Sequence, residues 1–513
     1  MTAPRTRPVP AQDAGAGAQP GAGRTGGFDP GPAWMRVLPP VATFLIMMWG
    51  ITGASYWRDE AATLGAVQRS FADLLRMLGN IDAVHGAYYI LIWAFVRVGG
   101  TGELVTRLPS AVAMAAAAAA VAALGRRLVS PRAGLASGLV FAVLPPVSMY
   151  GQDARPYAIV VMLAAVASYL LVRAMAAERG HRAPWLVGYA ACLAVLGIVD
   201  IFGLLLIAAH AVTVALRCLR TEDSRSARSL ALGWLAAAVA GTILTSPVLA
   251  LGYVQKGTLS WLLLPGLVEV RGLTGLIGPG PMAAAVALVV AAGIVVSAVA
   301  GREGGRGGGW GLRADWPGSL PALCLPWLIL PPAILLIGSL ITPLYTLRYV
   351  LMCIPAIALL AGAGLAAIGW IAGTAALAVI TLLGGSAQLA ERAPNGHTDN
   401  VRRADRIVAA NLRPGDAVLE FKAENFAEAY PFGIRDLNNI AQARTPIQSA
   451  TLIGTFLPDP VVRQRLAHVS RVWVVEYGHR VRLPILNGLH FRLVRSWQTS
   501  DIWLFLYAQS NGD

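Results

Sequence analysis

Long apolar runs are the feature that most limits what this chain can fold into. Several reach the roughly 20 residues that an α-helix needs to cross a bilayer. Of the 513 residues, 56% are hydrophobic and only 13% are charged, which excludes a soluble globular protein of this size. The chain is therefore predicted to be a polytopic α-helical membrane protein with about eleven spans, in the apolar runs near 34–54, 106–125, 133–149, 157–176, 184–199, 201–219, 229–251, 282–300, 319–341, 345–363 and 365–386.

Two shifts in composition divide the chain into three parts. Residues 1–32 are rich in Pro, Gly and Ala and cannot bury enough apolar surface to fold, so they are predicted to be a disordered tail. Residues 33–386 contain the spans. Residues 387–513 mix polar and apolar residues and are predicted to form a soluble α/β domain. Its predicted strands are "DAVLEF", "RVWVVEYGH" and "DIWLFLYAQ", and its predicted helix is "NVRRADRIVAANL".

Arginine counts orient the predicted spans. With residues 1–32 in the cytoplasm, the cytoplasmic loops are "GRRLVSPR", "AERGHR", "RCLRTEDSRSAR" and "GREGGRGGGWGLR", and all four are rich in Arg. Residues 55–104 and 149–157 then form two loops on the outer side, where the C-terminal domain also lies. The apolar segment 86–100 is shorter than a span and carries interfacial aromatics, so it is interpreted as an amphipathic helix at the outer interface. If it crossed the bilayer instead, every later loop would invert.

The formal net charge of +14 bears on partners. In a membrane protein such an excess indicates cytoplasmic loops and contacts with anionic lipid headgroups, and no nucleic-acid partner is predicted.

Charged residues in the two outer loops are the candidates for chemistry. In a chain poor in charge, such groups persist at membrane depth when they are paired or functional. A partly desolvated carboxylate has a raised pKa and suits the removal of a proton from a hydroxyl group. For any single residue, a solvated helix end is an equally good interpretation, and the grouping in two loops is what favours a site. The residues are Asp59, Glu60, Asp82, His85, Asp153 and Arg155.

The order of several motifs resembles a known superfold. "YWRDEAATL", "NIDAVHGAYYIL", "RLPSAVAM", "LGRRLV" and "YGQDARPYA" follow one another between residues 35 and 220, and "TLRYVLMCIPAIALLAGAG" comes later, at 346–364. This set is similar to the GT-C polyprenyl-phosphate-sugar-dependent glycosyltransferases, in particular the bacterial relatives of the protein O-mannosyltransferases and the lipid A aminoarabinose transferase. The resemblance implies a multi-pass enzyme of the bacterial cell membrane that moves one sugar, most often mannose, from a polyprenyl-phosphate donor to a hydroxyl of an envelope glycan, glycolipid or protein on the outer face.

The resemblance also implies roles for individual residues. Asp59 is the base, Glu60 is its neighbour, and Asp153 orients the acceptor or the sugar. The donor phosphate and sugar are held by His85, Arg155, Lys256 and Arg348. Secondary candidates are Arg58, Asp82, Tyr150, Gln152, Tyr157 and Asp200. The chain departs from the family pattern at "HGAYY", where two prolines would follow the His, and at Asp200, where a His would precede "FG".

The implied mechanism is a single displacement with inversion, because a lipid phosphate leaves readily and only the acceptor needs a base. The outer segments contain no Gly-rich nucleotide loop and no His/Cys cluster with metal-ligand spacing, so neither a cofactor nor a metal site is predicted. The charge of Asp59, Glu60 and Asp153 would nevertheless suit a divalent cation. The alternatives are a transporter or lipid flippase, which would carry ionisable groups within its spans and related halves, and an arabinofuranosyltransferase or oligosaccharide ligase of the same superfold.

Overall fold

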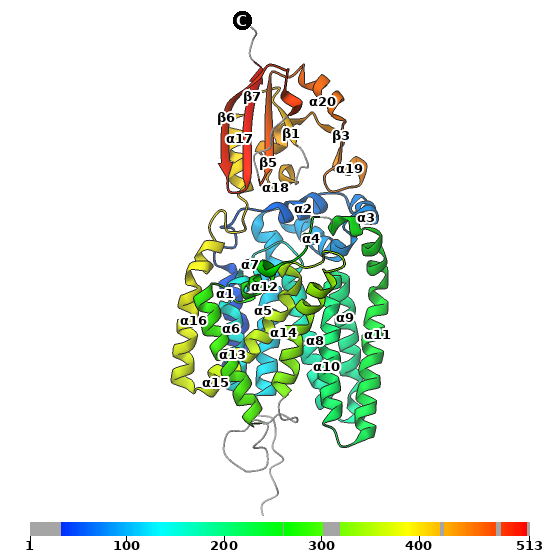
Figure 1. Cartoon of the computed structure of the whole chain (residues 1–513), viewed down its shortest axis with the longest axis vertical. Helices are drawn as coiled ribbons and strands as arrows, with labels where there is room; N and C mark the ends of the chain where they lie inside the picture. The colour runs from blue at the N-terminus through cyan, green and yellow to red at the C-terminus, as the bar shows by residue number, and fades with distance from the viewer. Residues whose placement is uncertain (1–31, 260, 301–318, 421–424, 479–483, 510–513) are drawn as a thin grey trace, which may run out of the picture.

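The computed structural model describes residues 32–259, 261–300, 319–420, 425–478 and 484–509. A bundle of long helices carries a domain with a β-sheet at one end, called the domain end of the bundle below (Figure 1). The predicted tail lies outside the described residues, except for residue 32.

Helices that could cross a membrane make up about half of the described chain. Eight are long and apolar enough, or up to ten if each of two bent pairs counts as one span, while α1 (Trp34–Met48) is shorter, with 15 residues. A multi-pass membrane protein is thereby confirmed. The spans are formed by α5 (Glu103–Leu128), α8 (Tyr157–Ala176), α9 (Ala183–Val199), α10 (Leu206–Leu219), α11 (Ser224–Val254), α14 (Ser319–Gly338), α15 (Ile354–Ala367) and α16 (Trp370–Glu391). Three of them reach span length together with the 3-10 helix that precedes them, as Arg179–Val199, Ile201–Leu219 and Leu347–Ala367. The bent pairs are α6 (Pro131–Val143) with α7 (Pro145–Gly151) and α12 (Leu267–Gly272) with α13 (Gly280–Ala300).

The run predicted as one span near 133–149 is a bent pair. The axes of α6 and α7 differ by 64°. Leu144 between them is extended, with φ −67° and ψ 123°, as expected for a residue that precedes proline. Pro145 and Pro146 then start α7 without the backbone N–H groups that would continue α6. The break precedes residues 152–156, which it directs back into the domain end of the bundle.

Small residues let two helices of the bundle approach closely. A Cβ atom built on Gly364 of α15 would lie 2.0 Å from the carbonyl oxygen of Val289, and one on Gly293 of α13 would lie 2.1 Å from that of Leu360. Backbones packed at this distance gain dispersion energy, which is a main source of helix association in lipid. The two glycines therefore set the spacing between α13 and α15.

Three short helices cover the domain end of the bundle. They are α2 (Arg58–Val67), α3 (Phe71–Asn80) and α4 (Gly86–Gly99), and they lie between the long helices and the sheet domain (Figure 1). The predicted outer loop 55–104 is thus mostly helical. Buried residues of α2 and α4, such as Leu64 and Tyr89, belong to the same apolar cluster as Val408 and Trp473 of the C-terminal domain. This shared core fixes the domain against the bundle.

The C-terminal domain is built on a mixed five-stranded sheet in the order β2-β1-β5-β7-β6. β1 is parallel to β2 and β5, whereas β7 is antiparallel to β5 and β6. The predicted helix and the three predicted strands are confirmed as α17 (Val401–Asn411), β1 (Ala417–Glu420), β5 (Arg471–Tyr477) and β7 (Ile502–Gln509). The remaining elements are β2 (Asn438–Asn439), β3 (Gln442–Arg444), β4 (Thr455–Phe456), β6 (Phe491–Thr499), α18 (Phe426–Ala429), α19 (Pro446–Ser449) and α20 (Asp459–Leu466).

Short 3-10 helices connect many of these elements. The ones that bear on the site are η1 (Ala83–His85), η3 (Ile201–Leu205) and η6 (Leu347–Cys353). The others are η2 (Arg179–His181), η4 (Lys256–Leu259), η5 (Leu273–Leu276), η7 (Gly433–Asp436) and η8 (Pro484–Leu486).

The close packing of α13 and α15 is testable. Gly364→Val places a branched side chain where even a Cβ would meet backbone, so we expect a loss of roughly 1–3 kcal/mol or more and a lower unfolding temperature. Gly385→Val on α16 is the matched control, because nothing lies within 4 Å of a Cβ at that position. Thermal unfolding in detergent, followed by tryptophan fluorescence, measures both. Equal effects of the two substitutions would contradict the packing.

Candidate active site

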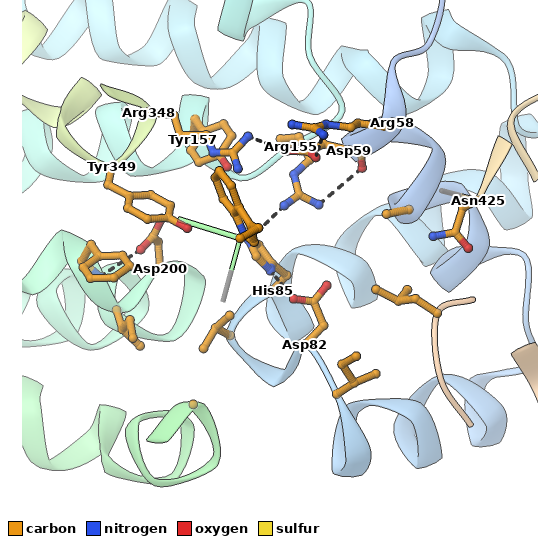
Figure 2. A pocket seen from close by; sticks show the side chains of 18 of the residues that line it. Arg58, Asp59, Asp82, His85, Arg155, Tyr157, Asp200, Arg348, Tyr349 and Asn425 are labelled. Atoms are coloured by element: carbon orange, nitrogen blue, oxygen red, sulfur yellow. Dashed lines mark hydrogen bonds and ion pairs between the residues drawn. The ribbon is translucent and has the colours of Figure 1, made fainter. Parts of the chain in front are cut away.

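A cavity of about 470 Å³ lies at the domain end of the bundle (Figure 2). This volume is within the range of small-molecule sites. Loop and helix-end residues of the bundle form most of its wall, and Asn425, Leu452 and Ile453 of the C-terminal domain complete it. The charged residues and the histidine that line it are Arg58, Asp59, Asp82, His85, Arg155, Asp200 and Arg348.

Asp59 is the predicted base that lines the cavity. It lies in the first turn of α2, where a carboxylate is favoured by the helix dipole. Arg348 Nη1, from η6, donates a hydrogen bond to Asp59 Oδ2 at 2.7 Å, and Arg58 Nε lies 4.0 Å from Asp59 Oδ1. The Asp59 side chain is 18% exposed. The structure thus pairs two of the predicted site residues that are 289 positions apart.

Arg155 is oriented by a short chain of hydrogen bonds. Its Nη2 lies 3.1 Å from His85 Nε2, and His85 Nδ1 lies 2.7 Å from Asp82 Oδ1. A guanidinium can only donate, so we assign Nε2 as the acceptor and Nδ1–H as the donor to Asp82. Tyr89 donates its hydroxyl to the other oxygen of Asp82. His85 therefore holds Arg155, and because His85 also lines the cavity, its contact with the donor stays a prediction.

The Asp82 carboxyl is kept ionised by its neighbours. Burial would raise its pKa, but the interaction with His85, together with the charge of Arg155, holds the pKa well below its ordinary value. Arg155 itself has no carboxylate within ion-pair distance among the described residues; its Nη1 reaches only the Asp59 carbonyl and the Tyr89 hydroxyl, both at 3.4 Å. The cavity wall therefore holds a positive charge that suits an anionic group.

Glu60 lies behind the cavity and is fully buried against Arg107 of α5. Arg107 donates from Nε to Glu60 Oε1 at 2.8 Å and from Nη2 to Oε2 at 2.7 Å. The backbone N–H of Ala154 also donates to Oε1, at 2.8 Å. Burial would raise the pKa of Glu60, but the charge of Arg107 outweighs burial and lowers it to about 2. Glu60 therefore ties the two predicted outer loops together and does not line the cavity.

Asp153 and its neighbours also lie outside the cavity lining. Trp57 Nε1 donates to Asp153 Oδ1 at 3.0 Å, and Oδ2 has no hydrogen bond to any described residue. Burial, and after it the charge of Glu60, raises the pKa of Asp153. Gln152 donates to the carbonyls of Met47 and Trp49 and so anchors the end of α1. Tyr150 packs edge-on against Tyr157.

Glu60, Asp153 and His397 are the described residues that come nearest to a metal site. Their ligand atoms lie within 4.8 Å of one another, and all three side chains are buried. Neither ring nitrogen of His397 has a hydrogen bond within the described ranges, although Nδ1 is 3.6 Å from Glu60 Oε2. A cation there would have to share Glu60 with the Arg107 guanidinium, whose charge opposes it. The arrangement therefore favours a structural cluster behind the cavity.

The remaining predicted residues divide between the cavity and the surface. Tyr157 and Asp200 line the cavity. Lys256 is exposed, with its ammonium 4.8 Å from the Tyr253 ring, and it is not among the lining residues.

Several site residues were not predicted. Arg107 could have been identified from the sequence, because it is a charged residue just inside an apolar run. Nothing in the sequence marks Asp399, which follows α16 by several residues. Its Oδ2 nevertheless accepts a hydrogen bond from the Arg58 backbone N–H at 3.0 Å and caps α2. Tyr349 and Trp261 line the cavity, and nothing in their sequence context separates them from other membrane aromatics.

Comparisons with known proteins agree with this architecture. The model of the family described as dolichyl-phosphate-mannose-protein mannosyltransferase matches residues 86–251, about a third of the chain. ArnT from Cupriavidus metallidurans in the apo state is 15% identical, with a TM-score of 0.61 over 92% of this chain and 97% of ArnT. Its structure bound to undecaprenyl phosphate gives the same identity and TM-score over 93% and 98%. The chain has the GT-C glycosyltransferase fold. No curated protein matches it in sequence.

The GT-C fold explains why the charged residues gather where they do. The first helices after α1 and the turn after α7 both return to the domain end of the bundle, and η6 joins them from a distant part of the chain. In this fold the site is assembled from connections between the spans, so the long helices serve as its frame.

The buried pair of Glu60 and Arg107 predicts a large effect on stability. Glu60→Gln leaves the Arg107 charge buried without a partner, which costs about 3–5 kcal/mol. Asp73→Asn is the matched control, because Asp73 pairs with Arg76 on an exposed surface, where a pair contributes about 1 kcal/mol or less. Unfolding in detergent at neutral pH measures both substitutions, and a cost below about 1 kcal/mol for Glu60→Gln would contradict a strongly coupled buried pair.

The same pair has a defined pH dependence. The pKa of Glu60 is about 2 in the folded protein and ordinarily 4.5, so its stabilisation is fully present above pH 4.5 and is lost as the pH falls towards 2. In Glu60→Gln, the free energy of unfolding should not show this loss between pH 4.5 and pH 2.

Proposed function

We propose that this protein transfers a single sugar from a polyprenyl-phosphate donor to a hydroxyl group of an acceptor. The observation that carries the proposal is the joint lining of one cavity by Asp59, Arg155 and Arg348, at the end of a GT-C bundle. A lipid-linked phosphate fits because two guanidinium groups face the cavity. The structural relative ArnT, which is bound to undecaprenyl phosphate in one structure, supports this class of donor.

The reaction follows from the groups in the cavity. The acceptor oxygen attacks the anomeric carbon, its proton passes to an oxygen of Asp59, and the bond between the anomeric carbon and the phosphate oxygen breaks. The electron pair of that bond stays with the lipid phosphate, whose negative charge Arg155 and Arg348 stabilise. One displacement without an enzyme nucleophile inverts the anomeric centre.

The ion pair between Asp59 and Arg348 adds an order to the steps. Arg348 Nη1 donates a hydrogen bond to Asp59 Oδ2. A donor phosphate competes for the same guanidinium, and when Arg348 turns to it, that carboxylate oxygen becomes free to accept the acceptor's proton. We infer that the donor binds before the acceptor reacts.

Mannose is the sugar that we propose, supported by the description of the family whose model matches residues 86–251. We place the reaction on the outer face of a bacterial cell membrane, because the Arg-rich loops assign the opposite face to the cytoplasm. The acceptor is proposed to be an envelope glycan, glycolipid or protein. A transporter is less well supported, since the charged groups of the cavity lie at one end of the bundle.

The role of Asp59 predicts a specific loss of activity. Asp59→Asn removes the base while preserving shape, so transfer of radiolabelled mannose from a short-chain polyprenyl phosphate should fall by about 10²–10⁴-fold. Asp73→Asn changes a carboxylate of α3 that lies outside the cavity lining and should retain activity. Both variants are compared with wild type in membranes at equal expression. Undiminished transfer by Asp59→Asn would remove Asp59 from the mechanism.

The proposed orientation is testable by labelling in a variant in which Cys192, Cys218, Cys324 and Cys353 are replaced. Ser496→Cys is on the exposed strand β6, and Glu178→Cys follows the 20-residue helix α8, which leads away from the domain end. A membrane-impermeant maleimide should label Ser496→Cys in intact spheroplasts and Glu178→Cys only after permeabilisation. The reverse pattern would place the site on the cytoplasmic face.

A further inference from the structure

Asp200 is a carboxylate in the cavity wall that the proposed reaction does not use. It lies between α9 and η3, and its side chain and backbone together are 8% exposed. Its Oδ1 accepts from the Phe202 backbone N–H at 2.9 Å, while its Oδ2 has no hydrogen bond within the part of the chain that the structure describes. Figure 2 shows Asp200 beside Tyr349 and across the cavity from Asp82.

The other carboxylates of the cavity lining have basic partners. Asp59 pairs with Arg348, and Asp82 bonds to His85. Asp200 has no such partner within ion-pair distance in the described ranges. Burial raises the pKa of Asp200, and the hydrogen bond from the Phe202 N–H and the charges of Arg155 and Arg348 offset this only in part. Asp200 Oδ2 is not enclosed by protein atoms and opens onto the cavity, where the hydrogen-bond donors of a ligand can reach it.

Aromatic groups beside Asp200 provide a second feature of this end of the cavity. Tyr349 stacks on Phe202, with ring centroids 4.4 Å apart and planes inclined by 22°. The Tyr349 hydroxyl has no hydrogen bond to any described residue. The Asp200 carboxylate can only accept hydrogen bonds, whereas the Tyr349 hydroxyl can donate or accept them. Beside an aromatic wall, these groups match a ligand that carries hydroxyl groups on an apolar ring.

The cavity is therefore divided chemically. The phosphate-binding guanidinium groups of Arg155 and Arg348 are at one part of the wall, and Asp200 with Tyr349 is at another (Figure 2). Resting on the proposed function, we propose that Asp200 Oδ2 accepts hydrogen bonds from hydroxyl groups of the transferred sugar, with Tyr349 as a second contact. Asp200 then sets sugar specificity, while its Oδ1 keeps η3 in place.

The simpler alternative is that Asp200 only caps η3. Asp200→Asn separates the two roles, because the amide oxygen can still accept from Phe202 while the amide nitrogen replaces an acceptor with a donor. Asp223→Asn is the matched control: Asp223 caps α11 by accepting from the Arg225 backbone N–H and is not part of the cavity lining. Tyr349→Phe removes only the hydroxyl.

The experiment compares binding of two probes to the full-length protein in detergent. One is a short-chain polyprenyl phosphate without sugar, and the other is the same lipid carrying mannose or arabinofuranose. The ratio of the two affinities is the contribution of the sugar. We expect Asp200→Asn to lower the affinity for whichever sugar-bearing lipid binds more tightly by about 10- to 100-fold, because hydrogen bonds to a charged group are lost. The affinity for the bare lipid phosphate and the unfolding temperature should stay unchanged.

The outcomes are distinct. If wild type binds no lipid phosphate, the proposed function fails. If wild type binds the bare lipid and no tested sugar strengthens the binding, the sugar contact is absent and the inference is wrong. It is also wrong if Asp200→Asn keeps the sugar contribution intact. If Asp200→Asn unfolds, Tyr349→Phe decides, because a reduced sugar contribution supports the subsite and an unchanged one contradicts it.

Discussion

The buried ion pair between Glu60 and Arg107 is the interaction on which the site depends. It joins α2, which carries Asp59, to α5, and through the Ala154 N–H it also holds the turn that carries Arg155. Arg107 further donates to the carbonyls of Ile51 and Ala54, which precede α2. A paired charge without solvent contact is rigid, because any displacement leaves both groups unsatisfied. The neighbouring residues Asp59 and Arg155 are thereby held at the cavity wall.

The C-terminal domain completes this arrangement from the other side. The Asp399 carboxylate caps α2 at Arg58, and Tyr430 accepts from the Tyr56 backbone N–H at 3.0 Å. Arg402 reaches the carbonyls of residues 52–54 and the carboxylate of Glu103. The segment that leads into α2 is therefore fixed by both parts of the protein, so we expect displacement of the domain to disturb Asp59 as well.

The sequence predicted the membrane class, the C-terminal α/β domain and several of the residues that line the cavity, but not the contacts between them. Apolar runs and alternating strand patterns are local, so they can be read from the chain. The role of Glu60 depends on its contact with Arg107 from another helix, and the role of His85 depends on its contact with Arg155. Such contacts between distant parts of the chain cannot be inferred from the neighbouring residues in the sequence. β6 was missed because "FRLVRSWQT" lies at a sheet edge and remains polar and exposed. The break at Pro145 could not be predicted from the proline pair alone, because Pro39 and Pro40 lie within α1 and Pro331 and Pro332 lie within α14.

The configuration of the product tests the proposed mechanism most directly. If Asp59 takes the proton of the acceptor and no side chain attacks the sugar, a single displacement must invert the anomeric centre. NMR of the product formed from a donor of known configuration determines the outcome. An inverted centre is the predicted result. Retention would require two displacements and a covalent or equivalent intermediate, which would contradict the assignment of Asp59 as a base acting on the acceptor.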